Sequence, residues 1–190
     1  MKISSDIDID VNEGVYTPSD DTFLLLEMID LNGGESVLEI GCGSGIVSLH
    51  CAQKGCKVMA IDISREAVKN TLFNAERNGL DLDGTVMDMF LGLSGHWDII
   101  IFNAPYLPKE EELELDHRWD GGEKGDESLV WFLSEAQKYL KESGYIYFVC
   151  SDRAPLKNIN TLIDERYLTL EIRSKTFSFE TIYSFKLKIK

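Results

Sequence analysis

The chain has 190 residues, of which 44% are hydrophobic, and a formal net charge of −14. This length and apolar content fit one domain with a single core and exclude a disordered chain. The negative charge disfavours a nucleic-acid partner and favours a protein or small-molecule substrate, particularly a basic one. Apolar runs fall far short of the roughly 18 residues of a membrane helix, and the first residues lack the apolar region of a signal peptide. We expect one cytoplasmic domain over residues 1–190, with no membrane partner.

The N-terminal part alternates apolar and polar residues over 3–11, which predicts an exposed edge strand. The chain then runs extended into Pro18, and Ser19 or Asp20 begins a helix that continues to about Asp30. The next elements alternate between strand and helix. They are a strand ending before Gly41, a helix over 46–53, a strand over 57–61, a helix over 64–77 and a strand over 84–87.

A nearly continuous apolar run over 97–102 is typical of a strand buried on both faces of a parallel sheet. A charged loop follows, and the remaining elements are a helix over 127–140, a strand over 145–150, a helix over 155–165 and strands over 168–176 and 181–189. Alternating strands and helices that close on a hairpin predict the α/β class. We expect a doubly wound, mainly parallel seven-stranded sheet with one antiparallel edge strand, plus a short N-terminal strand and helix.

A glycine-rich turn joins the first buried strand to its helix, in the order Gly41-Cys42-Gly43-Ser44-Gly45. The three glycines remove each Cβ from the side that a ligand approaches, and the helix directs its backbone N–H groups at the turn. Asp62 ends the next strand, about 20 residues on, where an acid accepts hydrogen bonds from ribose hydroxyls. Together these features indicate a cofactor that carries a nucleoside.

Further polar residues follow strands that end at the same edge of the sheet, where ligands bind in this class of fold. They are Asp88 and the sequence Asn103-Ala104-Pro105-Tyr106. The Asn103 side-chain oxygen and the Ala104 carbonyl provide two acceptors for the N–H groups of an amide or aromatic amine, which orients a poorly nucleophilic nitrogen toward an electrophile. Pro105 stiffens the turn, and Tyr106 provides a flat face for stacking.

Structural roles compete with these functional ones. Asn103-Ala104-Pro105-Tyr106 is also compatible with an ordinary turn, and Asp88 with a solvated acid. Glu39 lies between two apolar residues and must pair if buried, either with backbone or with a cofactor amine. His50, His96 and His117 fit no catalytic spacing. The four cysteines follow no zinc pattern and are predicted to be reduced structural thiols, so we predict no metal site; they are Cys42, Cys51, Cys56 and Cys150.

These residues resemble the class I S-adenosylmethionine-dependent methyltransferases, which have a Rossmann-like fold, and more narrowly the HemK-like family with its Asn-Pro-Pro-Tyr signature. The segment from Tyr16 to Leu25 and the sequence Trp119-Asp120-Gly121-Gly122 resemble the archaeal and eukaryotic branch. The resemblance implies methylation of the glutamine in a Gly-Gly-Gln sequence of class I translation release factors, with S-adenosylmethionine as cofactor.

The resemblance also implies roles for matching residues. Asn103, Ala104, Pro105 and Tyr106 form the catalytic set, and Asn103 also lies at the cofactor. The cofactor set is Tyr16, Thr22, Glu39, Gly41, Cys42, Gly43, Gly45, Asp62, Ile63, Asp88, Met89 and Asn103. Two residues depart from the family pattern. Ala104 replaces a proline whose backbone carbonyl is the required group, and Thr17 replaces a glutamate, which we expect to alter the N-terminal contact with the cofactor.

The resemblance further implies a small zinc-binding activator subunit, docked on an apolar patch near the third strand or the N-terminal hairpin. The acidic loop over 109–127 is our candidate for the segment that binds a basic loop of the substrate. The alternatives are an adenine-N6 methyltransferase on DNA or RNA, and a methyltransferase acting on another protein, including lysine, or on a small molecule. A nicotinamide-dependent oxidoreductase is disfavoured by the Gly-x-Gly-x-Gly spacing. A non-catalytic cofactor-binding or scaffolding subunit is a further alternative.

Overall fold

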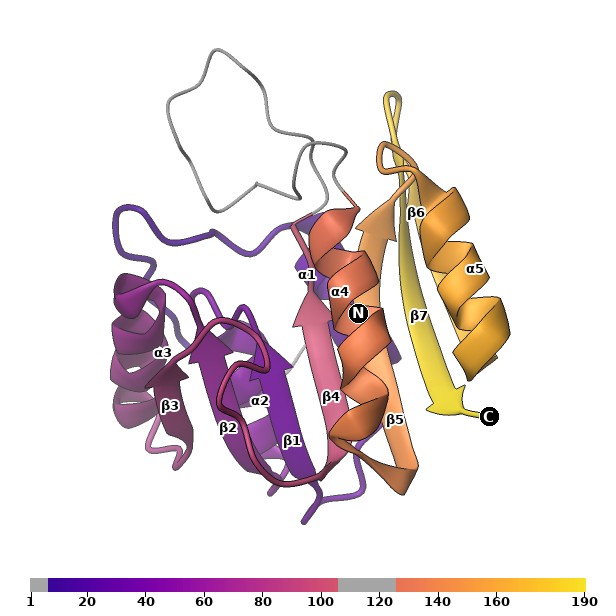
Figure 1. The fold of residues 1–190 in the computed structure, drawn as a ribbon. Coiled ribbons are helices and arrows are strands. Elements are labelled where there is room, and N and C mark those ends of the chain that lie inside the picture. The colour runs from indigo at the N-terminus through magenta and orange to yellow at the C-terminus, as the bar shows by residue number, and fades with distance from the viewer. Residues whose placement is uncertain (1–6, 106–125) are drawn as a thin grey trace.

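The computed structural model describes residues 7–105 and 126–190, and Tyr106 and residues 109–125 of the acidic loop lie outside them. Seven strands form one sheet in the order β3-β2-β1-β4-β5-β7-β6 (Figure 1). The strands are β1 (Ser36–Ile40), β2 (Lys57–Asp62), β3 (Asp83–Val86), β4 (Trp97–Asn103), β5 (Leu140–Ser151), β6 (Tyr167–Thr176) and β7 (Thr181–Ile189). The helices are α1 (Asp20–Met28), α2 (Ile46–Gln53), α3 (Arg65–Arg77), α4 (Glu127–Glu135) and α5 (Leu156–Arg166), with a 3₁₀ turn η1 (Ala136–Lys138) after α4.

Helices cover both faces of the sheet, so its central strands are buried on both sides. Apolar residues of α1 and α2 pack on one face, whereas α4 and α5 pack on the other (Figure 1). Ile100 and Ile101 are adjacent in β4 and point to opposite faces, yet both have an exposed fraction of 0%. The prediction of a strand buried on both faces is therefore confirmed.

The sheet confirms the expected fold class and defines the position of its antiparallel strand. β7 pairs antiparallel with β5 on one side and with β6 on the other, so the antiparallel strand lies within the edge region and β6 is outermost. Burial explains this order. β7 buries Ile182 and Leu187, whereas β6 carries Arg173 and Lys175 among mostly exposed positions, and charged side chains protect an outer strand from unwanted pairing.

Two predicted boundaries around α4 and β5 were wrong. The helix expected over 127–140 ends at Glu135 and tightens into η1. β5 begins at Leu140 instead of 145, because Leu140 pairs with Trp97 before a register shift in β4. Gly144 therefore lies inside a strand, where a Cβ would come within 2.8 Å of the Asp98 carbonyl oxygen.

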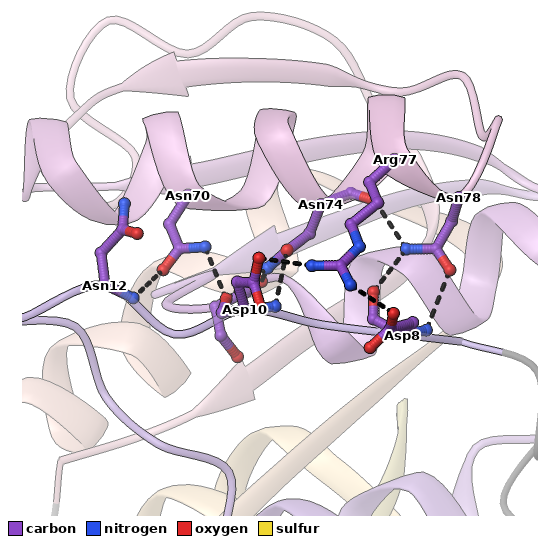
Figure 2. A network of polar contacts seen from close by, with 8 residues as sticks. Asp8, Asp10, Asn12, Asn70, Asn74, Arg77 and Asn78 are labelled. Carbon is purple, nitrogen blue, oxygen red and sulfur yellow. Dashed lines mark hydrogen bonds and ion pairs between the residues drawn. The ribbon is translucent and has the colours of Figure 1, made fainter.

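The N-terminal strand predicted over 3–11 does not form within the described residues. Residues 8–12, here called the strap, are extended but lie against α3 (Figure 2). Their backbone N–H groups donate to asparagine side-chain oxygens at 2.8–2.9 Å. The donor and acceptor pairs are Asp8 with Asn78, Asp10 with Asn74, and Asn12 with Asn70. Asn78 and Asn74 also donate to the carbonyls of Asp8 and Asp10.

Matching repeat distances explain this pairing of a strap with a helix. Asparagines four residues apart on a helix are separated by about 6 Å along its axis, and two residues of extended chain span about 6.6 Å. Each second backbone amide of the strap therefore meets a side-chain amide of α3. Arg77, on the same helix, adds ion pairs to Asp8 and Asp10 (Figure 2).

Replacing Asn74 by alanine tests how strongly the strap is held. Asn74 is fully buried, accepts from the Asp10 N–H and donates to the carbonyls of Asp10 and Ser44. Its loss leaves buried backbone groups unpartnered, so we expect the free energy of unfolding in urea to fall by about 2–3 kcal/mol. Asn78→Ala is the control, because water reaches the groups that it frees at the exposed end of the strap. Equal losses in the two variants would contradict the role assigned to burial.

Candidate active site

The glycine-rich loop lies between β1 and α2, at the carboxyl edge of the sheet. Gly41, Gly43 and Gly45 have φ values of 68°, 52° and 88°, which glycine adopts without the strain that other residues incur. The loop is attached to its surroundings on two sides. The Gly43 N–H donates to Asp62 Oδ2 at 3.1 Å, and its carbonyl accepts from Thr71 Oγ1 at 3.1 Å.

The missing Cβ atoms of the loop do not all face a ligand, as the sequence had suggested. A Cβ on Gly45 would lie 2.8 Å from Thr71 Cγ2 and 3.0 Å from Leu49 Cδ1, and a Cβ on Gly41 would lie 3.5 Å from the Phe102 ring. At Gly43 the nearest atom is Tyr16 Cβ, at 3.8 Å. Packing against α3 therefore requires glycine at Gly45, whereas at Gly41 and Gly43 the backbone conformation is the reason for glycine.

Asp62 connects the end of β2 to the loop. Its Oδ2 accepts from Gly43, and its Oδ1 accepts from the Ser64 N–H at 2.8 Å. Burial raises the pKa of Asp62, and the backbone N–H groups of Ser64, Gly43 and Ile63 oppose this effect. Each carboxylate oxygen has a second lone pair, so Asp62 retains acceptor capacity for hydroxyl donors. Ile63, next in the chain, is 66% exposed beside it.

The turn after β3 contains an unusual backbone conformation. Met89 has a φ of 43° and is the one non-glycine residue with a positive φ among those described. This conformation costs about 1–2 kcal/mol in an ordinary residue, and such strain is concentrated at functional sites. Its partly buried side chain packs on the core, whereas Asp88 is exposed and its carbonyl accepts from the Leu91 N–H at 3.0 Å.

Glu39 has a partner that the sequence did not suggest. The side chain is 2% exposed and accepts a hydrogen bond from the Ser48 hydroxyl on α2, and the Ser48 backbone N–H also lowers its pKa, so a side-chain hydroxyl acts beside the backbone partner that the sequence allowed. Burial raises the pKa of Glu39 to about 8; the bond from Ser48 opposes the shift and the nearby Asp62 adds to it. Glu39 is therefore mostly protonated at neutral pH.

Asn103 ends β4 and faces the start of α1. Its Nδ2 donates to Asp21 Oδ2 at 3.3 Å and to Thr22 Oγ1 at 3.1 Å. Within the described part of the chain, Asn103 Oδ1 is buried and has no hydrogen-bond partner. Buried polar atoms are rarely left unpaired, and an unpaired one calls for an explanation. Asn103 therefore presents an unused acceptor at the carboxyl edge of the sheet.

Tyr16 also reaches this cluster, from the segment that joins the strap to α1. Its hydroxyl donates to Asp21 Oδ1 at 2.6 Å, and burial, followed by the charge of Asp21, raises the pKa of Tyr16. The structure thus brings Tyr16, Thr22 and Asn103 together around Asp21, which the sequence analysis did not single out. The available signal was an acid directly before Thr22, at the start of the apolar run Phe23–Leu26.

The remaining residues of the catalytic set lie on the turn after β4. Ala104 is 3% exposed and packs in the core, and the Pro105 carbonyl accepts from Ser128 Oγ of α4 at 3.4 Å.

Among the residues that the structure describes, no group of three or more His, Cys, Asp or Glu side chains is arranged to hold a metal ion. The same residues include no helix that is both long and apolar enough to cross a membrane.

The chain is similar over most of its length to known methyltransferases. The family model of the methyltransferase small domain matches residues 9–183. The chain is 37% identical over 151 residues to MJ0928 of Methanocaldococcus jannaschii, which carries the name of a protein N5-glutamine methyltransferase, and the match covers 76% of each chain. It is 28% identical to the eRF1 methyltransferase catalytic subunit mtq2 of Schizosaccharomyces pombe, over 86% of this chain and 84% of that protein.

A solved structure shows the same fold. The methyltransferase from Pyrococcus furiosus superposes with a TM-score of 0.75, covering 98% of this chain and 91% of that one at 23% identity. The similarity extends over the whole sheet, including the antiparallel edge region, and is not confined to the glycine-rich loop.

Proposed function

This chain belongs to the methyltransferase small-domain family, and we propose that it transfers a methyl group from S-adenosylmethionine to the side-chain nitrogen of a glutamine in a protein. The proposal rests on Asn103 Oδ1, which is buried at the carboxyl edge of the sheet and has no hydrogen-bond partner among the described residues. A glutamine amide carries N–H donors on the atom to be methylated, and one of them provides the partner that Asn103 Oδ1 lacks.

The chemical difficulty is that an amide nitrogen is a weak nucleophile, because its lone pair is delocalised into the carbonyl. Asn103 Oδ1 and the Ala104 carbonyl accept its two N–H groups, which aims the nitrogen at the methyl donor and stabilises the positive charge that develops on it. Pro105 restricts the turn that carries these acceptors, and Tyr106, outside the described residues, stacks on the target amide. The methylated nitrogen becomes acidic, so no strong base is required.

S-adenosylmethionine supplies an electrophilic methyl group when bound. The residues at the carboxyl edge fit such a group, because the glycine loop is braced by Asp62, whose carboxylate retains acceptor capacity. In this proposal Asp62 and Ile63 hold the ribose, and Asp88 and Met89 hold the adenine. The loop residues Gly41, Cys42, Gly43 and Gly45 hold the methionine end, with Tyr16, Thr22 and Asn103 beside it, while Glu39 supports the loop from the α2 side.

We propose a class I translation release factor as the substrate. The name of the fission yeast relative specifies a release factor, that of the archaeal relative specifies protein glutamine, and a net charge of −14 disfavours nucleic acid. The acidic loop over 109–127, of which residues 109–125 lie outside the described part of the chain, remains our candidate for binding a basic loop of the substrate.

Mass spectrometry of a release factor incubated with the protein and S-adenosylmethionine tests this function. We expect one added methyl group on the glutamine of its Gly-Gly-Gln sequence. The same release factor with Gly-Gly-Asn is the matched control, because its shorter side chain keeps the amide but withdraws it from Asn103. Transfer to an oligonucleotide in its place, or no transfer to the glutamine by a protein that binds the cofactor, would overturn the proposal.

A small zinc-binding activator subunit is the partner that we propose for the edge at β3. Val86 on this outer strand is 47% exposed and Phe73 on the adjoining α3 is 51% exposed, so an apolar surface borders unpaired strand backbone. Gel filtration with the candidate subunit is expected to show a complex that Phe73→Asp weakens. Absence of a complex with the unchanged protein would count against this partner.

A further inference from the structure

We propose that Asp21 is a positioning residue, which fixes the amide of Asn103 with its oxygen toward the target nitrogen and its NH₂ group toward the protein. The inference rests on the proposed function and adds to it a residue that acts through Asn103. It follows from three features of the site, which are the burial of Asp21, the donors around its first oxygen, and the Asn103 amide, the one group of the described residues that faces its second oxygen.

Asp21 is held in place by donors on one of its two oxygens. Oδ1 accepts from the Tyr16 hydroxyl at 2.6 Å, the Ser19 hydroxyl at 2.8 Å, and the N–H and hydroxyl of Thr22 at 2.6 and 3.2 Å. These groups come from the segment before α1 and from its first turn. Because they fix Oδ1, they also fix the direction of Oδ2, which faces Asn103 Nδ2 at 3.3 Å.

A carboxylate facing an asparagine amide permits only one of the two amide orientations. A carboxylate only accepts hydrogen bonds, so the NH₂ group of Asn103 must face Asp21 Oδ2, and the oxygen must face away. The reverse orientation would set two oxygens against each other. It would also present N–H groups to the N–H groups of the target, so the nitrogen would not be held. The negative charge behind the amide further polarises Asn103 Oδ1 and makes it a better acceptor.

The burial of Asp21 is compensated by hydrogen bonds and by its place in the first turn of α1, but not by a cation. Its side chain is 2% exposed, and among the described residues no Lys or Arg forms an ion pair with it, although its exposed neighbour Asp20 pairs with Lys175. Burying a carboxylate without a cation is unfavourable even when hydrogen bonds compensate part of the cost. A negative charge held directly behind the acceptor of the target amide gives this burial a purpose.

Asp21→Asn tests the inference because the change is isosteric. The donors around Oδ1 still require an acceptor, so the new side chain places its oxygen there and its NH₂ group against Asn103, which must then reverse its own amide. We expect kcat for glutamine methylation to fall by about 100-fold or more, with cofactor affinity unchanged. Because both changes remove the same acceptor, the double variant with Asn103→Ala is expected to be no slower than Asn103→Ala alone.

Asp20→Asn is the matched control, since it removes an adjacent carboxylate that does not contact Asn103, and it is expected to keep wild-type kcat. The orientation of the Asn103 side-chain amide can also be measured by NMR in the absence of substrate. The side-chain NH₂ signals of Asn103 in NMR spectra, identified by their loss in Asn103→Ala, are expected to shift in Asp21→Asn and not in Asp20→Asn. If Asp21→Asn does not fold, Tyr16→Phe carries the test, because loss of one donor to Asp21 is expected to lower kcat about tenfold.

Two results would overturn the inference. One is wild-type kcat in Asp21→Asn, or in Tyr16→Phe where that variant carries the test, when Asn103→Ala is slowed as expected. The other is unchanged Asn103 NH₂ signals in folded Asp21→Asn. A wild-type protein that transfers no methyl group to glutamine would instead overturn the proposed function, and the NMR comparison would still decide whether Asp21 orients Asn103.

Discussion

Replacing Asn103 by alanine is expected to slow methyl transfer by about 10²–10³-fold, with S-adenosylmethionine affinity nearly unchanged. The side chain contributes an acceptor that stabilises charge developing on the target nitrogen, so its loss acts on the transition state. Single-turnover rates report the chemical step, and the rise in melting temperature on adding S-adenosylmethionine reports cofactor binding.

Asn32→Ala is the control for this experiment. Asn32 lies just before β1, at the opposite edge of the sheet from Asn103, and its side chain donates to Glu35 Oε1 at 3.2 Å. We expect its methyl-transfer rate to equal that of the unchanged protein. If Asn103→Ala lost cofactor binding and turnover together, Asn103 would act mainly as a cofactor ligand. Its free side-chain oxygen would then not support the proposed binding of the target glutamine.

The centre of the fold was predictable because its signals are local. The strand before Gly41, the glycine-rich loop and α2 follow one another within twenty residues, and the predicted helix over 46–53 agrees with the structure. The apolar run at β4 allowed only one environment, burial on both faces. Parallel strands then bring Asp62 and Asn103 to one edge, so the position of the candidate site followed from the common direction of the strands.

The strap was misassigned because its sequence pattern is correct for an extended chain but does not identify what that chain pairs with. Ile7, Ile9 and Val11 are partly buried and alternate with exposed residues, as in a strand. The pairing partner is instead a row of asparagines more than 50 residues away. Their spacing of four residues was visible in the sequence, but a strap on a helix forms only when both elements are already placed.

The hydrogen-bond partners of the buried acids could not be predicted from the sequence either. Asp21 pairs with Asn103, which is 82 residues away in the chain, and Glu39 pairs with Ser48 across the glycine loop. The sequence showed that a buried Glu39 needs a partner, but the choice among hydroxyl, backbone and ligand depends on how α2 packs against β1. Side-chain pairs of this kind are set by tertiary packing, whereas strands and turns are set largely by neighbouring residues.

The second large effect concerns stability and pH. Glu39 has a pKa of about 8 in the folded protein and an ordinary one of about 4.3 when unfolded. Between these values the folded state holds a proton that the unfolded state has released. The contribution of Glu39 to stability is therefore complete below about pH 4.3, falls by about 1.4 kcal/mol per pH unit as the pH rises, and is lost once the pH passes 8.

Glu39→Gln removes this titration while keeping an oxygen that accepts from Ser48. We expect the variant to gain stability relative to the unchanged protein by about 1.4 kcal/mol for each unit between pH 5 and 8, and to show no further relative gain above pH 8. Urea unfolding at a series of pH values measures this difference. The difference in free energy of unfolding between the two proteins at each pH cancels the contributions of other titrating groups. One such group is His50, whose pKa is lowered by burial.

Glu35→Gln is the matched control for Glu39→Gln. Burial opposes the charge of Glu35, but hydrogen bonds, including those from Asn32, outweigh burial and lower its pKa. Glu35 is therefore ionised in both states above pH 6, and its replacement is expected to shift the stability curve without changing its slope between pH 6 and 8. A slope in Glu39→Gln equal to that of the unchanged protein would mean that Glu39 is ionised when folded. The carboxylate would then need a cationic partner on the α2 side of the sheet, which is the role that a cofactor amine would fill.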